Sequence, residues 1–338
     1  MTIFCAAHAA APPEEVIDRV RYVRRGSKLS VYPAGMAALR RGLLGSADVV
    51  VDVQNGLPFF SRLVTRAPVV VLVHHVHREQ WPVVGPVLAR IGWFLESKVA
   101  VRANRGNRYL AVSEVTRSEL VSLGVRAGDI QIAYNGLPRA PVREPVPASE
   151  TPRIVVLSRL VPHKQIEHAI ELMPQLLERY PDATLQVLGS GWWHDNLVAV
   201  RDRLGLHHHV VFHGHVTEEE KFAELERAWV HVLPSLKEGW GLSIIEAASV
   251  GTPSVAYRSA GGVQESILED VTGLLADDRA QLAQQVSDLL GDAERRHDLG
   301  AKAQARSEHF SWDATTVRVA EQLFGEESDG SGAGHSSA

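Results

Sequence analysis

The sequence has few of the features that mark secreted or membrane-spanning proteins. It contains one cysteine, Cys5, in 338 residues, so no disulfide can form within the chain and a reducing compartment is expected. No basic segment precedes an apolar one near the first residue, as a signal peptide would require. The longest apolar runs, such as residues 68–73, are far shorter than the roughly 18–20 residues of a membrane span. These absences predict a cytoplasmic protein.

Charge is distributed unevenly along the chain. The net charge is −5, but residues 1–150 carry +7 and residues 151–338 carry −12. A basic half favours an anionic partner, such as acidic lipid headgroups or a phosphorylated ligand, whereas the alternative is two solvated faces of opposite sign. Peripheral contact with the inner face of the cell membrane therefore stays open, and nucleic acid is not expected as a partner.

Short β-rich runs alternate with helical stretches in both halves of the chain, which predicts an α/β protein with parallel sheets and right-handed crossovers. The expected strands are residues 2–5, 21–24, 49–53, 69–74, 108–112 and 130–134, then 154–158, 184–188, 210–212, 230–233 and 254–257. The expected helices are residues 36–44, 84–104, 114–123, 165–180 with a kink at Pro174, and stretches of 279–324. A further helix follows Thr217, which forms a capping box with Glu220.

Five prolines between residues 138 and 152 divide the chain, because proline fixes φ and lacks an amide donor. We expect an amino-terminal domain of residues 1–140, a linker of 141–152 and a carboxy-terminal domain of 153–310. Residues 311–325 are expected to form a helix that packs back on the first domain. Residues 326–338 are small and polar, and predict a disordered tail.

The most informative segment is EGWGLSIIE, from Glu238 to Glu246. It follows a predicted strand and opens a helix, so its glycines and free amide groups suit a phosphate. The two carboxylates of this segment would repel a diphosphate, so we expect them to bind hydroxyl groups of the ligand instead. An ordinary glycine-containing loop before a solvated helix is the alternative.

A second segment, from Arg159 to Lys164, lies between a predicted strand and a helix. Ligands bind at the carboxyl ends of strands in open α/β sheets, and two cations at such a place suit a diphosphate. A pair of surface cations at a turn is the alternative interpretation.

Together these segments resemble family 4 of the retaining glycosyltransferases, which have the GT-B fold. The resemblance is carried by LSRLVPHK, LQVLGSG, VVFHGHV, LPSLKEGWGLSIIEAASVGTPSVA and GGVQESI…TGLL, and it covers nearly the whole chain. It implies two Rossmann-like domains facing each other across a cleft, with a UDP- or GDP-sugar as donor. It also implies a reaction without metal or other cofactor, in agreement with the lack of an Asp-x-Asp motif.

The resemblance assigns roles to individual residues. Arg159 and Lys164 match the cations that hold the donor diphosphate. Glu238 matches the carboxylate that contacts the donor sugar, and Glu246 matches the one that binds the ribose hydroxyls. The backbone against sugar and phosphates corresponds to Gly239, Trp240, Gly241 and Leu242, and the turn that lines the base to Gly214, His215 and Val216.

Two groups of histidines need interpretation. Family members often place a histidine after the strand at residues 69–74, near the reacting sugar, and His74 is the best match, with His75 and His77 as competitors. A metal site and plain loop structure are the other interpretations. The second group straddles a short strand, where neighbours point to opposite faces, so we interpret it as a solvated turn with one or two donor-site members. This group comprises His207, His208, His209, His213 and His215.

Family members usually begin with a strand and a glycine-rich loop that reaches the donor phosphates. Residues 1–5 match the family's second strand, so the first strand and its loop are expected to be missing. A missing strand leaves a sheet position uncovered, which predicts pairing with another copy, a homodimer.

The function that these observations predict is hexosyl transfer with retention, to a saccharide, lipid or small-molecule acceptor. No carboxylate stands out as a nucleophile, which favours same-face attack through an oxocarbenium-like ion pair. The alternatives are a nucleotide-sugar-binding protein with little or no turnover, and another GT-B enzyme such as a phosphorylase. Residues 85–108 combine aromatic and basic side chains, which fits a membrane-facing helix or a core helix with a basic outer face.

Overall fold

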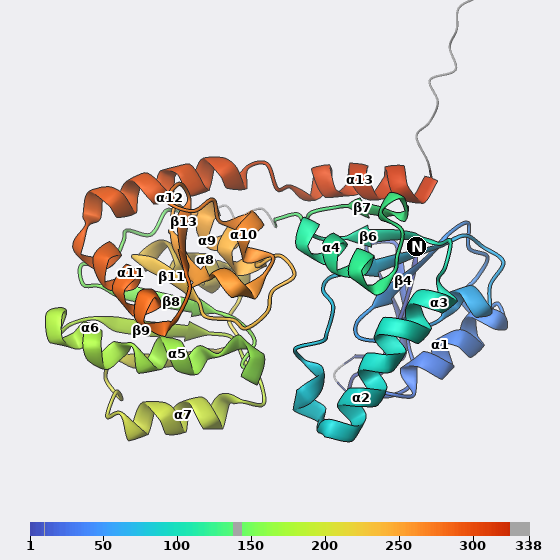
Figure 1. The fold of residues 1–338 in the computed structure, drawn as a ribbon, viewed down its shortest axis with the longest axis horizontal. Coiled ribbons are helices and arrows are strands. Elements are labelled where there is room, and N and C mark those ends of the chain that lie inside the picture. Colours follow the sequence, from blue (N-terminus) through green and yellow to red (C-terminus); the bar gives the residue numbers. More distant parts are fainter. Residues whose placement is uncertain (10, 138–143, 325–338) are drawn as a thin grey trace, which may run out of the picture.

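The computed structural model describes residues 1–9, 11–137 and 144–324, which form two α/β halves lying side by side (Figure 1). The expected tail and the first part of the expected linker lie outside the described residues. Among the described residues, no helix is both long and apolar enough to cross a bilayer.

The amino-terminal half contains a parallel sheet in the order β4-β5-β6-β7. Its strands are β4 (Val50–Gln54), β5 (Val69–Val73), β6 (Arg108–Ala111) and β7 (Ile130–Ile132). Strand β5 consists of four valines and one leucine and is largely buried, as expected for a central parallel strand. The helices of the amino-terminal half are α1 (Val31–Arg40), α2 (Pro86–Phe94), α3 (Val101–Ala103) and α4 (Glu114–Leu123). The π-helical segment η3 (Leu95–Ala100) joins α2 to α3.

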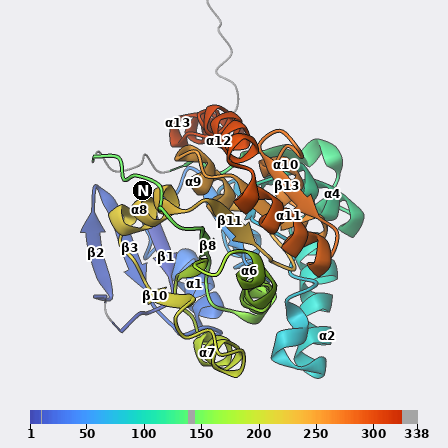
Figure 2. The same ribbon diagram turned by 90° about the vertical axis from the view of Figure 1, so that its left-hand side faces the viewer.

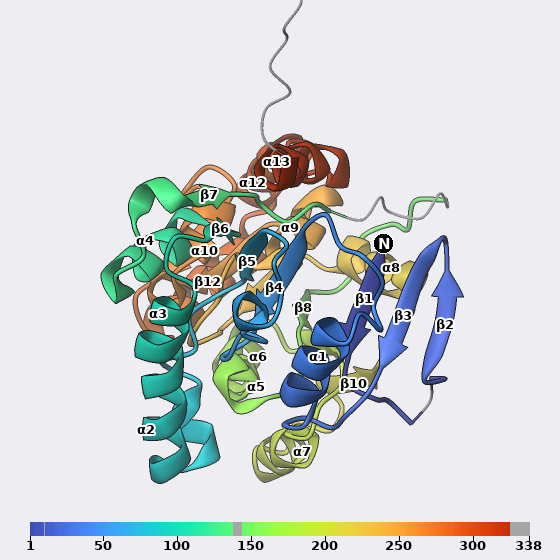
Figure 3. The same cartoon turned by 90° about the vertical axis from the view of Figure 1, so that its right-hand side faces the viewer.

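The first three strands form a separate sheet in the order β1-β3-β2, to one side of β4 (Figure 3). They are β1 (Thr2–Cys5), β2 (Glu14–Ile17) and β3 (Val20–Arg24). Strands β1 and β4 are therefore edge strands of two sheets in the part of the chain that the structure describes. Val51 and Val53 on β4 are partly exposed, and the expected pairing with another copy stays a prediction.

The carboxy-terminal half has a six-stranded parallel sheet in the order β10-β9-β8-β11-β12-β13. Its strands are β8 (Arg153–Leu157), β9 (Thr184–Leu188), β10 (Val210–Gly214), β11 (Val230–Leu233), β12 (Ser254–Tyr257) and β13 (Gly273–Ala276). In chain order this is the doubly wound arrangement 3-2-1-4-5-6, whose direction reverses between β8 and β11. Helices on both faces complete the layers: α5 (Ile166–Glu171), α6 (Met173–Arg179), α7 (His194–Arg203), α8 (Glu218–Arg227), α9 (Leu242–Ser249), α10 (Val263–Ser266), α11 (Arg279–Gly291) and α12 (Ala293–Ser307).

Some expected elements differ from the observed ones. The single helix expected at 165–180 is two helices that meet at Leu172, with Pro174 in the first turn of α6, where a missing amide costs little. The helix expected at 36–44 begins at Val31 instead and tolerates Pro33 in its first turn. Strands β2 and β13 were not expected. The capping box of Thr217 and Glu220 is confirmed.

The last helix, α13 (Trp312–Phe324), crosses from the carboxy-terminal half to the amino-terminal one, nearly in line with α12 (Figures 1 and 2). Its Val319 and Leu323 pack against the core that contains Leu110 of β6. The Arg108 guanidinium donates to the Leu323 carbonyl at 3.1 Å.

Candidate active site

The topology places two loops at the switch point of the carboxy-terminal sheet. One follows β8 and carries Arg159 and Lys164, and the other follows β11 and carries Glu238. The Lys164 ammonium donates to the Glu238 carboxylate at 2.5 Å, and both side chains are largely buried, at 14% and 11% exposure. Arg159 is exposed and makes no ion pair with another described residue. The structure thus brings Lys164 together with Glu238, and it places Arg159 on the same loop as Lys164 without a contact to the carboxylate.

The second carboxylate of the segment, Glu246, lies within α9 and pairs with Lys221 of α8 at 2.7 Å. Both side chains are 9% exposed, and Lys221 also binds the exposed Glu218. Burial raises the pKa of Glu246, and the ion pair with Lys221 opposes that rise. Sequence reasoning missed Lys221, because a lysine on an amphipathic helix normally faces solvent.

The loop after β11 touches the other half of the molecule. A Cβ added at Gly239 would lie 1.9 Å from the His74 carbonyl oxygen, so the backbone of this loop contacts the end of β5. The next residue, Trp240, is buried and packs against Tyr134 and Phe310, with ring centroids 4.5 and 5.0 Å apart. Gly241 then adopts a φ of +85°, a left-handed conformation that favours glycine, and α9 begins at Leu242.

The turn expected to line the base follows β10. The Gly214 carbonyl accepts from the Gly189 amide at 2.8 Å, and Gly189 in turn lies against the Ser158 carbonyl. His215 is exposed, and Val216 packs in the apolar cluster that includes Ala247, the neighbour of Glu246. The turn and the buried carboxylate therefore share one end of the sheet.

The three histidines after β5 have different surroundings. The His74 side chain is exposed, whereas His75 is half-buried and contacts Gln80. Burial, and then the charge of His77, lower the pKa of His75 to about 3. His74 is therefore the most accessible of the three histidine side chains.

The third histidine, His77, belongs to a buried polar network. Its ring nitrogens lie 3.3 Å from Glu96 and 2.8 Å from Asn55, and Trp81 donates to the same glutamate at 2.6 Å. Glu96 is fully buried in the π-helical segment, a distortion that is frequent at functional sites. No motif in the sequence points to Glu96, which directly follows the apolar stretch at residues 93–95. No three His, Cys, Asp or Glu side chains in the described ranges are grouped as metal ligands.

Two further contacts join the halves beside the site. The Glu265 carboxylate of α10 accepts from the amides of Glu114 and Val115, both at 2.9 Å, at the amino terminus of α4. Lys237, next to Glu238, forms an ion pair with Glu119 of the same helix. A carboxylate at a helix amino terminus meets free amides and the positive end of the dipole, so α4 is held against the carboxy-terminal half.

Comparisons with known proteins identify the family of the chain. A family model described as "Glycosyl transferases group 1" matches residues 141–306, and one described as "Glycosyltransferase Family 4" matches residues 1–141. The GDP-mannose-dependent alpha-(1-6)-phosphatidylinositol monomannoside mannosyltransferase of Mycolicibacterium smegmatis is 29% identical over 333 residues, covering 90% of this chain and 84% of that protein.

Solved structures are similar in fold. The sucrose-phosphate synthase of Thermosynechococcus elongatus has a TM-score of 0.78 at 19% identity, covering 95% of this chain and 87% of that one. HepE of Anabaena in complex with UDP-glucose has a TM-score of 0.72 at 19% identity, covering 89% and 85%.

The fold is therefore the GT-B fold of glycosyltransferases, with two Rossmann-like domains facing each other, as the sequence predicted. The chain belongs to glycosyltransferase family 4. It is a glycosyltransferase whose relatives include nucleotide-sugar-dependent mannosyltransferases.

Proposed function

We propose that this protein is a hexosyltransferase that moves a hexose from a nucleotide-diphosphate sugar to a lipid or saccharide acceptor, with retention and without a metal. The observation that carries the proposal is the Lys164–Glu238 pair at the switch point, next to the contact between Gly239 and His74. These groups belong to both halves and lie where an open α/β sheet binds its ligand.

The two lysines explain how a diphosphate can bind beside two carboxylates. Lys164 neutralises Glu238 and Lys221 neutralises Glu246, so the exposed Arg159 remains as an uncompensated cation toward the donor. In this proposal Arg159 and Lys164 bind the diphosphate, Glu238 accepts from sugar hydroxyls and Glu246 accepts from the ribose hydroxyls. The segment Gly239 to Leu242 lies against sugar and phosphates, and Gly214 to Val216 lines the base.

The chemical step follows from this arrangement. The bond from the anomeric carbon to the diphosphate oxygen breaks, and the departing charge is stabilised by Arg159, Lys164 and the amino terminus of α9. The acceptor oxygen attacks from the face that the diphosphate leaves, and its proton passes to a phosphate oxygen. His74 lies beside the reacting sugar and contributes polar contact there. No metal or other cofactor takes part.

GDP-mannose and a phosphatidylinositol-linked acceptor are the first substrates that we propose, because the mycobacterial relative carries both in its name. The surface of α2 supports a lipid acceptor, since it projects at the edge of the amino-terminal half (Figure 1) with four apolar side chains that are each more than half exposed. They are Val87, Leu88, Ile91 and Phe94. We therefore propose a cytoplasmic protein at the inner face of the membrane.

The test is a thermal-shift panel of UDP, GDP, UDP-sugars and GDP-mannose, followed by transfer to the acceptor. Arg159→Ala is expected to lower turnover roughly 100-fold or more, because it removes charge stabilisation of the leaving group. The matched control is Arg203→Ala, on α7 and remote from the switch point. Activity that persists in EDTA supports the metal-free reaction.

Near-normal turnover of the Arg159 variant would overturn the assignment of the diphosphate site. A nucleotide that binds without transfer or hydrolysis of its sugar would favour the alternative, a nucleotide-sugar-binding protein. Full activity on a soluble sugar without liposome binding would contradict the lipid acceptor.

A further inference from the structure

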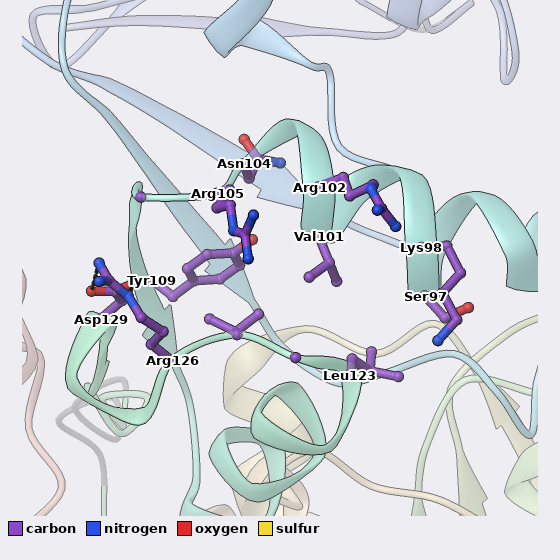
Figure 4. Close-up of a pocket in the computed structure, with 13 residues that line it drawn as sticks. Ser97, Lys98, Val101, Arg102, Asn104, Arg105, Tyr109, Leu123, Arg126 and Asp129 are labelled. Atoms are coloured by element: carbon purple, nitrogen blue, oxygen red, sulfur yellow. Dashed lines mark hydrogen bonds and ion pairs between the residues drawn. The ribbon is translucent and has the colours of Figure 1, made fainter.

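A cavity of about 650 Å³ lies in the amino-terminal half, away from the candidate active site (Figure 4). It is bounded by η3 and α3 on one side and by the end of α4 on the other. Its lining residue Tyr109 lies near the start of β6, and Asp129 immediately precedes β7. Because the sheet is parallel, these amino ends lie at the edge opposite to the one where β5 delivers His74. The cavity is therefore separate from the donor site.

The lining of this cavity is strongly basic. Four cations surround it: Lys98, Arg102, Arg105 and Arg126. Figure 4 shows Lys98 at one end and Arg105 and Arg126 at the other. The only carboxylate of the lining, Asp129, accepts from the Arg126 guanidinium at 2.8 and 3.0 Å.

The other three cations, Lys98, Arg102 and Arg105, make no ion pair with another described residue. Cations gathered around a concave surface repel one another and raise the local potential for an anion.

Two donors of the lining also lack a hydrogen-bond partner among the described residues, and one of them, on Asn104, is buried. Tyr109 is 2% exposed, and its hydroxyl makes no hydrogen bond within the described ranges. Burial, and then the charge of Asp129, raise the pKa of this phenol, so it keeps its proton and remains a donor. The side-chain amide nitrogen of Asn104 is buried and unpartnered as well. The Tyr109 hydroxyl lines the cavity, so an oxygen-rich ligand there would supply the acceptor that this donor lacks.

We propose that this cavity binds the phosphate group of a second ligand, distinct from the nucleotide sugar. Guanidinium groups match the geometry of phosphate oxygens, and the Tyr109 hydroxyl supplies a neutral donor at the wall of the cavity. The cavity is larger than a phosphate ion needs, so a phosphorylated small molecule or a phospholipid headgroup supplies the group. The proposal does not depend on which sugar the active site transfers.

The experiment compares the wild-type chain with Arg102→Gln/Arg105→Gln. Inorganic phosphate is titrated by calorimetry, and binding to phosphatidylcholine vesicles is measured with and without phosphatidylinositol. The double variant is expected to weaken phosphate binding at this cavity at least about tenfold. Arg40→Gln/Arg41→Gln at the end of α1 removes the same charge outside the cavity and is the matched control.

Loss of phosphate binding in the cavity variant, but not in the control, supports a soluble phosphorylated ligand. Loss confined to phosphatidylinositol vesicles supports a lipid headgroup. Equal binding of both probes by the variant and the wild type, or an equal loss in the control, overturns the proposal. Tyr109→Phe provides a second variant: it removes only an unpartnered hydroxyl and should weaken phosphate binding several-fold while the thermal midpoint stays unchanged.

Discussion

The substitution Gly239→Ala tests whether the activity depends on contact between the two halves. Gly239→Ala adds one methyl group where the nearest atom is the His74 carbonyl oxygen, 1.9 Å from the new Cβ position. That atom belongs to the backbone at the end of β5, so no flexible side chain can move aside. Gly239 does not have a positive φ, and the clash rather than the backbone conformation decides the outcome.

The size of the effect follows from the distance. Since Cβ atoms essentially never approach other heavy atoms closer than 3.0 Å, the loop must move by more than about 1 Å from β5. The same loop carries Glu238, so the carboxylate that we propose to contact the donor sugar moves relative to His74. A misplacement of about 1 Å can cost on the order of 100-fold in rate, and we expect kcat/KM to fall by about this factor. Nucleotide affinity should fall less than kcat/KM, because Glu246, which we propose to bind the ribose, and its partner Lys221 lie on helices behind the loop.

The assay is steady-state transfer, with nucleotide binding measured in parallel on the same protein. Gly128→Ala is the matched control, because a Cβ there meets nothing within 4 Å and its φ is not positive. A loss of transfer with intact nucleotide binding supports the contact between the halves as part of the working enzyme. Normal transfer by Gly239→Ala would refute the reasoning, since it would show that the contact is dispensable.

Two other predictions concern buried charge. Lys221→Met leaves the Glu246 carboxylate buried without its counter-charge, so its pKa rises further and nucleotide binding should weaken roughly tenfold to 100-fold at neutral pH. Titrations across pH check this, with recovery expected at higher pH and in Lys221→Arg; an unchanged Kd would contradict it. His75 stays neutral in the folded chain down to a pKa of about 3, whereas the unfolded chain takes up its proton near pH 6.5. Folding stability is therefore lost as pH falls from about 6.5 toward 3, and His75→Gln should flatten the decline of the melting temperature between about pH 7 and pH 5; equal slopes would speak against this.

The sequence predicted most of the strands that are buried on both faces, although it missed the buried strand β13. The strands expected at 184–188, 230–233 and 254–257 have those bounds in the structure, since parallel strands are apolar runs between turn residues. Strand β2 was missed because its sequence, EEVI, has two charged residues and pairs antiparallel at an edge. The loops after β8 and β11 could be placed at one sheet edge because chain order alone sets the switch point.

Contacts that depend on tertiary packing could not be predicted in the same way. Lys221 and Glu246 are 25 residues apart and meet because α8 and α9 pack together. The carboxylate of Glu265 reaches the amino terminus of α4 across about 150 residues of chain. No local pattern encodes such pairs, so the residues that hold the two halves together were found from the structure alone.

These contacts also determine where substrates can lie. The space between Gly239 and the His74 carbonyl does not admit a methyl group, so a hexose cannot occupy it in this conformation. In the proposed complex the donor sugar therefore lies beside this contact, on the side of the Lys164–Glu238 pair, with His74 at its edge. Glu265 and Trp240 hold the same arrangement from behind, through α4 and Tyr134. Helix α13 follows α12 in the chain and packs on the amino-terminal half through Val319 and Leu323, so it links the two halves by a second route besides these contacts.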